Sequence, residues 1–260
     1  MSPDRLLDLV GRPDGPLADA SLWDLEVVES GPLGPNMKRL VLTAPGLEEL
    51  RWQPGHDLMF RVPRQGGEVV NRRYTVRRHE PDRPSVTIDV SLHGRGPGTD
   101  WVGTASVGDR IQAIGPRGKI TLAPTADWHL FVGDETGLPG ALAMIEALPP
   151  GSTALALFEV DSPADEQRPS GAHRDGTDLR WLHRNGRSAP GDASPLVDAS
   201  VAIALPPGDG HAYLAAEAGV VRSVREVFVG RGLQADQISA KAYWRRGLPN
   251  AEHGEPTRLD

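Results

Sequence analysis

The feature that most constrains the fold of this chain is a change in its pattern of apolar residues near Pro124. Before that point, short strand-forming runs are separated by Gly, Pro and Asp, and no long helical segment lies between them. Such spacing is typical of a β-sandwich or β-barrel. After that point, apolar strands alternate with helical segments, which indicates a parallel sheet. The sequence therefore predicts a β + α/β protein, in which an antiparallel β-barrel precedes a parallel-sheet α/β domain.

The expected elements divide the chain into four regions. An N-terminal extension covers 1–22 and includes a short helix at 3–10, and a loose tail covers 248–260. The β-barrel domain is expected at 23–124, with strands at 25–30, 37–44, 56–62, 72–78, 85–92 and 109–115. The α/β domain is expected at 125–247, with strands at 128–133, 152–160, 179–184, 211–216 and 238–246 and helices at 138–148, 194–204 and 220–232.

The composition excludes several kinds of site. The chain has 260 residues, which is enough for two medium domains, and it has no cysteine. Disulfides, thiolate metal sites, iron–sulfur clusters and cysteine nucleophiles are therefore excluded. An organic cofactor would have to carry any redox chemistry. Because His173, His183 and His211 show no metal-ligand spacing, no metal site is expected.

The charge and the apolar runs restrict the partners and the location. The net charge is −7, which argues against nonspecific binding of nucleic acid. No apolar run approaches the ~20 residues that span a bilayer, and the N-terminus lacks the apolar run of a signal peptide. We expect a cytoplasmic protein that acts as a monomer, without nucleic acid and without a membrane span.

The stretch NRRYTVRR, residues 71–78, carries more positive charge than a strand requires. Side chains alternate between the two faces of a strand, so Arg72 and Tyr74 are expected on one face and Arg73 and Thr75 on the other. Arginine binds phosphate through two parallel hydrogen bonds, and a tyrosine ring can lie against a flat heterocycle. This combination suits a dinucleotide with a planar ring. An exposed edge strand with outward arginines is the alternative.

Two glycine-rich stretches are candidate binding turns. HGRGPGTDW, residues 93–101, is a turn that leads into a short helix, where exposed backbone amides can bind an anion. GDETGLPG, residues 133–140, follows an apolar strand and precedes a helix, which is the usual place for a nucleotide turn in a parallel sheet. Taken alone, each stretch is equally consistent with an ordinary loop.

The chain resembles the siderophore-interacting, FAD-binding proteins, a branch of the ferredoxin-reductase-like superfamily, over roughly residues 22–247. The resemblance is carried, in order, by RRYTVR, VSLHGRGPGTDW, GDRIQAIGPRG, ADWHLFVGDETGLPGALAMIEALPPG, WLHR, AEAG and YWRRG. It implies that the barrel binds FAD and that the α/β domain binds NADPH or NADH. It also implies a reductase that delivers electrons to ferric siderophores and thereby frees iron.

The resemblance also implies roles for individual residues. It assigns Tyr74 and Thr75 to the isoalloxazine ring, where the reaction takes place, and Arg72 to the FAD phosphates. The full set assigned to the cofactors is Arg72, Tyr74, Thr75, Arg77, His93, Gly94, Gly98, Thr99, Gly133, Glu135, Thr136 and Pro139. Trp101 also matches the loop on the phosphate side.

Arginines elsewhere suggest how the donor and the iron substrate are bound. In the related reductases, the loop after the third sheet strand meets the 2′-phosphate of NADPH, so Arg184 is expected to favour that donor; a plain surface arginine is the alternative. In SAKAYWRRG, Lys241, Arg245 and Arg246 are expected to attract an anionic ferric siderophore. A purely structural role for these three residues is equally consistent with the sequence.

Two other functions remain open at this point. A reductase of the same fold could pass electrons to a protein partner. A non-enzymatic flavin-binding or ligand-binding protein could have kept the fold and lost the nicotinamide site. Gly137 and Gly140 keep this second alternative open, because the family more often has alanine there and glycine is expected to widen the turn.

Overall fold

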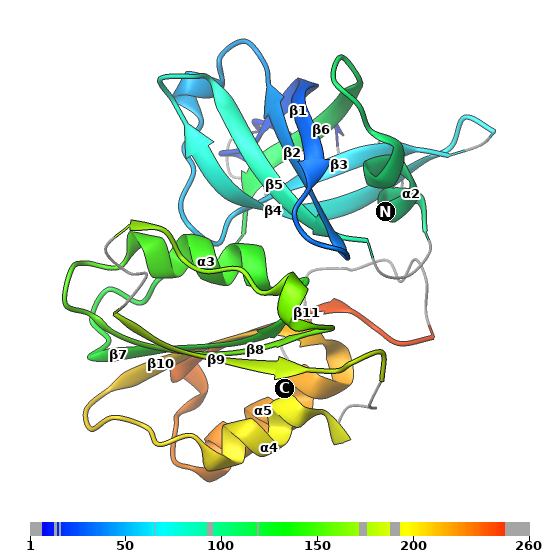
Figure 1. Ribbon diagram of the computed structural model, residues 1–260. Coiled ribbons are helices and arrows are strands. Elements are labelled where there is room, and N and C mark those ends of the chain that lie inside the picture. Colours follow the sequence, from blue (N-terminus) through cyan, green and yellow to red (C-terminus); the bar gives the residue numbers. More distant parts are fainter. Residues whose placement is uncertain are drawn as a thin grey trace. The chain divides into compact units, whose positions relative to one another are not determined.

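The computed structural model describes residues 7–12, 15, 17–64, 66–92, 96–118, 120–171, 176–187 and 193–247. The chain divides into two compact units, residues 1–121 and 122–260. The first unit is a β-barrel and the second is an α/β sheet, as the sequence predicts (Figure 1). Most of the helix expected at 3–10 and the whole tail 248–260 lie outside the described residues.

The first unit is a closed barrel with the strand order β1-β2-β5-β4-β3-β6. Neighbouring strands are all antiparallel. The elements are β1 (Ser21–Pro32), β2 (Met37–Thr43), η1 (Leu47–Glu49), β3 (Asp57–Pro63), β4 (Val69–Glu80), β5 (Ser85–Ser91), α2 (Pro97–Thr104) and β6 (Arg110–Arg117). Each expected strand of this domain is confirmed. Helix α2 occupies part of the connection between β5 and β6.

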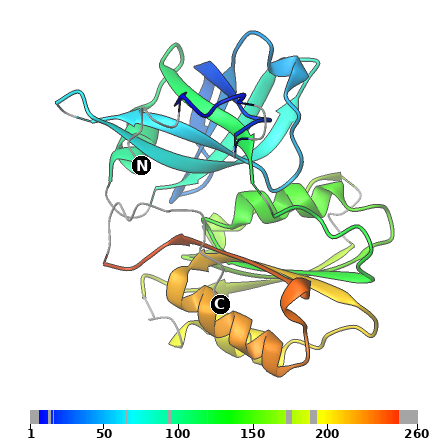
Figure 2. The ribbon, with the colours of Figure 1, turned by 180° about the vertical axis from the view of Figure 1, so that it is seen from behind.

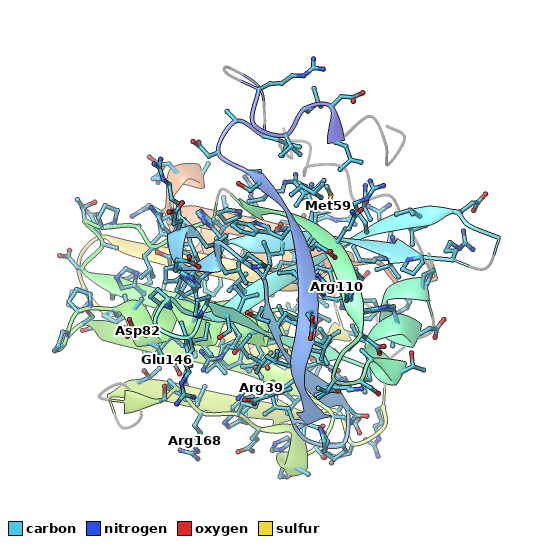
Figure 3. All side chains as sticks on the ribbon, turned by 90° about the horizontal axis from the view of Figure 1, so that it is seen from above. Arg39, Met59, Asp82, Arg110, Glu146 and Arg168 are labelled. Atoms are coloured by element: carbon cyan, nitrogen blue, oxygen red, sulfur yellow. The ribbon has the colours of Figure 1, made fainter. Side chains whose placement is uncertain are left out.

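Apolar side chains from all six strands fill the barrel, and alternate residues supply them. Leu58, Phe60 and Val62 of β3 are fully buried in this core, as is Ile88 of β5. At the seam where β6 closes onto β1, Arg110 forms ion pairs with Asp24 and Glu26 at 3.0 and 2.9 Å. Arg110 is labelled in Figure 3. These side chains are about half exposed, so closure depends mainly on the strand hydrogen bonds and the core.

The second unit is a parallel sheet with the strand order β11-β10-β7-β8-β9. Helix α3 lies on one face of the sheet, and α4 and α5 lie on the other (Figures 1 and 2). The elements are β7 (Trp128–Asp134), α3 (Leu138–Ala147), β8 (Thr153–Val160), η2 (Pro163–Asp165), β9 (Thr177–His183), α4 (Pro195–Ala202), β10 (Gly210–Glu217), α5 (Ala218–Gly230), η5 (Ala235–Gln237) and β11 (Ile238–Trp244). The strands and helices expected for this domain are confirmed.

The central strands of this sheet are buried on both faces, which explains their continuous apolar runs. Trp128, Leu130 and Val132 of β7 belong to the core that contains residues of α4 and α5. Polar side chains start both of these helices. Ser194 accepts a hydrogen bond from Leu196 N, and Glu217 accepts from the backbone N of Gly219 and Val220. Because Glu217 ends β10, and because Ser194 donates to Glu159 near the end of β8, both helices begin at the carboxyl edge of the sheet.

None of the helices in the described part of the chain has the length and apolar character that a membrane span requires.

Candidate functional site

The arginine-rich strand β4 meets the start of α2 at Gly98. A Cβ atom on Gly98 would lie 2.3 Å from Tyr74 Oη and 3.0 Å from Arg72 Cγ. Arg72 and Tyr74 therefore project from the same face of β4, as the strand alternation predicts. Only glycine permits this close approach between the first turn of α2 and the two side chains. The result is a basic and aromatic surface at a helix N-terminus, which is a favourable place for a phosphate.

Aromatic packing fixes the position of the Tyr74 ring. Phe60 of β3 contacts it edge-on, with ring centroids 5.1 Å apart, and Phe60 also contacts Trp101 of α2 at 6.0 Å. Burial raises the pKa of Tyr74 well above its ordinary value, although the nearby charge of Arg72 opposes the shift. The hydroxyl is therefore protonated at neutral pH and can donate a hydrogen bond to an acceptor such as a phosphate or a flavin carbonyl.

Arg72 remains a cation in this setting. Burial lowers its pKa, with a smaller contribution from Arg64, while Tyr74 opposes the shift. Because an arginine begins so far above neutral pH, its charge is retained. Its Nη1 donates a hydrogen bond to the carbonyl of Asn71 at 2.8 Å, which steadies the side chain.

Two further predicted FAD residues are buried in the barrel wall. Thr75 is buried and lies opposite Asp57 in the antiparallel register of β3 and β4. Arg77 has its Nε 4.0 Å from Asp89, and Asp89 also accepts two hydrogen bonds of 2.7 Å from Arg39. Arg77 therefore has a role within the barrel, and its contact with the cofactor stays a prediction.

The other predicted FAD residues lie before and within α2. Thr99 follows Gly98 in the first turn of that helix and is half-buried. His93 and Gly94, which were expected to contact the cofactor, lie outside the described residues.

At the carboxyl end of β7, Asp134 connects three strand ends of the second unit. Its Oδ1 accepts hydrogen bonds from the backbone and hydroxyl of Thr136. Its Oδ2 accepts from Trp244 Nε1 at 2.7 Å and from the backbone N of Glu217 at 3.1 Å. Burial and the neighbouring Glu135 raise the pKa of Asp134, while these hydrogen bonds oppose the shift. Asp134 thus joins the ends of β7, β10 and β11.

The glycines of the turn after β7 allow it to pack tightly on β10. A Cβ atom on Gly137 would lie 2.1 Å from the carbonyl oxygen of Ala215, and one on Gly133 would lie 2.6 Å from the same oxygen. The expectation that Gly137 widens the turn is therefore wrong, because its missing side chain permits a close contact. Pro139 follows in the first turn of α3.

The next residue of the turn, Glu135, forms a buried ion pair with Arg184. Arg184 lies just after β9, and both of its Nη atoms donate to the two carboxylate oxygens of Glu135. Its Nη1 also lies 3.4 Å from Glu159 Oε1 at the end of β8. The 2′-phosphate contact expected for Arg184 stays a prediction.

The basic residues near the C-terminus lie on and beyond the edge strand β11. Lys241 Nζ is 5.1 Å from the centroid of the Tyr243 ring, which places both side chains on one side of the strand as predicted. Arg245 and Arg246 follow the strand and are exposed. The backbone N of Arg246 donates to Glu217 Oε1 at 3.2 Å, so this segment is held at the carboxyl edge of the sheet.

Sequence reasoning missed the roles of Asp89, Asp134, Glu159 and Trp244. An acid directly after a buried strand was the available signal for Asp134, but its partners Glu217 and Trp244 are 83 and 110 residues away. Within the described residues, no group of three or more His, Asp or Glu side chains is arranged to hold a metal ion.

Comparisons with known proteins agree with this arrangement. The pattern of the siderophore-interacting FAD-binding domain matches residues 56–120, and that of the siderophore-interacting protein family matches residues 126–247. A Mycobacterium tuberculosis protein is 35% identical over 186 residues, and the ferric vibriobactin reductase of Vibrio cholerae is 31% identical over 183. Each alignment covers 68% of this chain and 65% of the relative, so the chain spans less than two thirds of these relatives' length.

A solved structure matches nearly the whole chain. The siderophore utilization protein from T. fusca has a TM-score of 0.80 and 32% sequence identity, and the match covers 90% of this chain and 97% of that one. The surface formed by Gly98, Arg72 and Tyr74 fits flavin adenine dinucleotide, because it combines a cation that can bind phosphate, an aromatic ring and the start of a helix. The chain belongs to the siderophore-interacting protein family, and its β-barrel is an FAD-binding domain.

Proposed function

We propose that this protein is an FAD-dependent NAD(P)H oxidoreductase that reduces ferric siderophores and so releases Fe(II). The observation that carries the proposal is the contact of Gly98 with Arg72 and Tyr74, inside the segment that matches the FAD-binding domain. The ferric vibriobactin reductase among the relatives supports the choice of substrate class. A nicotinamide donor also requires the nucleotide pool of the cell, so we place the reaction in the cytoplasm.

In this proposal, the barrel residues bind and orient the flavin. Arg72 and the first backbone amides of α2 hold the phosphates, since a guanidinium and a helix N-terminus both favour a dianion. Tyr74 and Thr75 would hold the ring, and Phe60 keeps Tyr74 in position. A bound FAD would supply the redox chemistry, since a flavin can accept two electrons from a nicotinamide and release them one at a time. No side chain has to move a proton, so the residues act through position and charge.

The turn after β7 is the proposed place for the nicotinamide nucleotide. Ligands of open α/β sheets bind at the carboxyl ends of the strands, and this turn lies between the central strand and the start of α3. Gly133, Glu135, Thr136 and Pro139 form it. The contact of Gly137 with Ala215 fixes its shape without a bulky side chain.

Reduction provides a physical route for iron release. Siderophores bind Fe(III) through hard oxygen donors, and Fe(II) is a softer ion that such donors hold less strongly. Many ferric siderophores are anionic, while this chain has a net charge of −7. A local cationic surface is therefore needed, and we assign it to Lys241, Arg245 and Arg246.

An absorption experiment under anaerobic conditions tests the proposal. The purified protein should show flavin bands near ~370 and ~450 nm, which are general properties of an oxidised flavin. Addition of NADPH or NADH should bleach the ~450 nm band, and a ferric siderophore should restore it. A colourless protein that takes up no added FAD would contradict the proposal.

The same experiment separates the two other functions. Bleaching by the donor without recovery on ferric chelates, but with recovery on a ferredoxin, would indicate a reductase for a protein partner. Flavin bands that neither donor bleaches would indicate a flavin-binding protein without a nicotinamide site.

A further inference from the structure

We propose that Arg184 is a positioning residue, which holds Glu135 in the turn after β7, in place of the phosphate contact expected from the sequence. The inference rests on the proposed function only in taking this turn as the binding place of the nicotinamide nucleotide. It assigns Arg184 no part in the choice between NADPH and NADH.

The geometry of the ion pair is the first reason. Arg184 Nη1 lies 2.7 Å from Glu135 Oε2, and Nη2 donates to Oε1, so the two planar groups face one another. Such bidentate pairs are stronger and more directional than single hydrogen bonds. The same Nη1 is 3.4 Å from Glu159 Oε1. The ends of the guanidinium that would bind a phosphate are therefore directed at carboxylates.

The local charge is the second reason. The side chains of Glu135 and Glu159 are only 3% and 10% exposed, and that of Arg184 is 19% exposed. Burial alone would lower the pKa of Arg184, but the hydrogen bonds and charges of Glu135 and Glu159 raise it overall. Arg184 thus faces two carboxylates. A phosphate dianion that approached Arg184 would meet a guanidinium whose charge is already matched by these carboxylates.

The place of the network in the sheet is the third reason. Glu135 follows β7, Glu159 is in β8 and Arg184 follows β9, and these three strands are neighbours. Ser194 extends the network, because its hydroxyl donates to Glu159 Oε2 at 2.8 Å and accepts from Leu196 N at the start of α4. Without Arg184, the buried carboxylates of Glu135 and Glu159 would lose a cation that both of them face, which is strongly unfavourable. The turn would lose its support from two neighbouring strands.

A double-mutant cycle in the full-length protein tests the pairing. The variants are Arg184→Gln, Glu135→Gln and the double variant, with Arg180→Gln as the matched control. Arg180 lies on β9 and pairs with Asp178 at 2.7 Å, but both of these side chains are 48% exposed. Arg184→Gln should lower the melting temperature by about 5–10 °C, and Arg180→Gln by about 1 °C or less. The double variant should recover part of the melting temperature lost in Arg184→Gln, because Glu135→Gln removes one of the two carboxylates that Arg184 faces.

Nucleotide binding, measured by calorimetry on the FAD-loaded protein, tests the second half of the inference. The probes are 2′,5′-ADP, which carries the 2′-phosphate, and 5′-AMP, which lacks it. Arg184→Gln should weaken both by a similar factor, so that the ratio of their affinities stays within about twofold of the parent. A fall of about tenfold or more in that ratio, with a melting temperature like that of the Arg180→Gln control, would overturn the inference.

A failure of the proposed function would give a different result. If the parent protein bound neither nucleotide, the proposed donor site would be wrong, while the melting temperatures would still report on the pairing. Equal losses in the Arg184→Gln and Arg180→Gln variants, or no recovery in the double variant, would show that Arg184 does not hold Glu135.

Discussion

Replacing Gly137 by alanine should destabilise the α/β unit, although most glycine-to-alanine changes at such a backbone angle are favourable. Gly137 has φ −84° and ψ −22°, which alanine adopts without strain. In the absence of a clash, the change would stabilise the protein by about 0.4–1 kcal/mol through the unfolded state. The new Cβ, however, would lie 2.1 Å from the carbonyl oxygen and 2.7 Å from the Cβ of Ala215.

The size of the destabilisation depends on whether the atoms next to the new Cβ can move away. The closest atom belongs to the backbone of β10, which is held between β7 and β11 and cannot rotate away as a side chain would. The hydrogen bond from Glu217 N to Asp134 also ties β10 to the turn. Overpacking of this kind costs about 1–3 kcal/mol or more. We expect the cost to reach the upper part of that range, with a net loss of about 2 kcal/mol after the entropic gain.

Urea unfolding followed by tryptophan fluorescence measures this loss. Gly230→Ala is the matched control, since Gly230 ends α5 in the same unit and nothing lies within 4 Å of its Cβ position. The control should be neutral or more stable by up to about 1 kcal/mol. Adding Ala215→Gly to Gly137→Ala should restore less than half of the loss, because the carbonyl contact remains. A Gly137→Ala protein as stable as the control would refute the reasoning.

Three further predictions concern charge and hydrogen bonding. Arg72→Ala should weaken FAD binding about ten- to a hundredfold, equivalent to ~1.5–3 kcal/mol, in a titration of the flavin-free protein; unchanged affinity would remove Arg72 from the site. The double variant Lys241→Ala with Arg245→Ala should lower kcat/KM for an anionic ferric chelate and flatten its dependence on salt, since screening shortens from ~10 Å at 0.1 M to ~3 Å at 1 M. A neutral chelate is the control, and equal losses for both would mean that the pair is structural. Asp134→Asn should lower the free energy of unfolding by about 2–3 kcal/mol in urea, because the amide nitrogen would face two donors; a change below about 0.5 kcal/mol would contradict the role of Asp134.

The fold could be predicted because its signals are local. Regular short strands indicated the barrel, and continuous apolar strands alternating with helices indicated the parallel sheet. Alternation along β4 also placed Arg72 and Tyr74 on one face, and the contact of both with Gly98 confirms it. Each of these inferences needed only neighbouring residues.

The contacts within the α/β unit could not be predicted, because they depend on strand order. From its sequence position, Arg184 could be a surface arginine or a phosphate ligand. Only the strand order β7-β8-β9 places its side chain against Glu135, which is 49 residues away in the sequence. From the sequence, Gly137 was expected to widen the turn. In the structure, the backbone of Ala215 lies against Gly137. Sequence spacing carries no information about either contact.

The most direct test of the proposed function is the ratio of Fe(II) released to donor oxidised. A hydride carries two electrons and each Fe(III) takes one, so the flavin has to divide them. Under anaerobic conditions, with a ferric siderophore and a chelator that traps Fe(II), we predict about two Fe(II) ions for each NADPH or NADH consumed. Donor oxidation without Fe(II), or no donor oxidation by a protein that holds FAD, would contradict the proposed function.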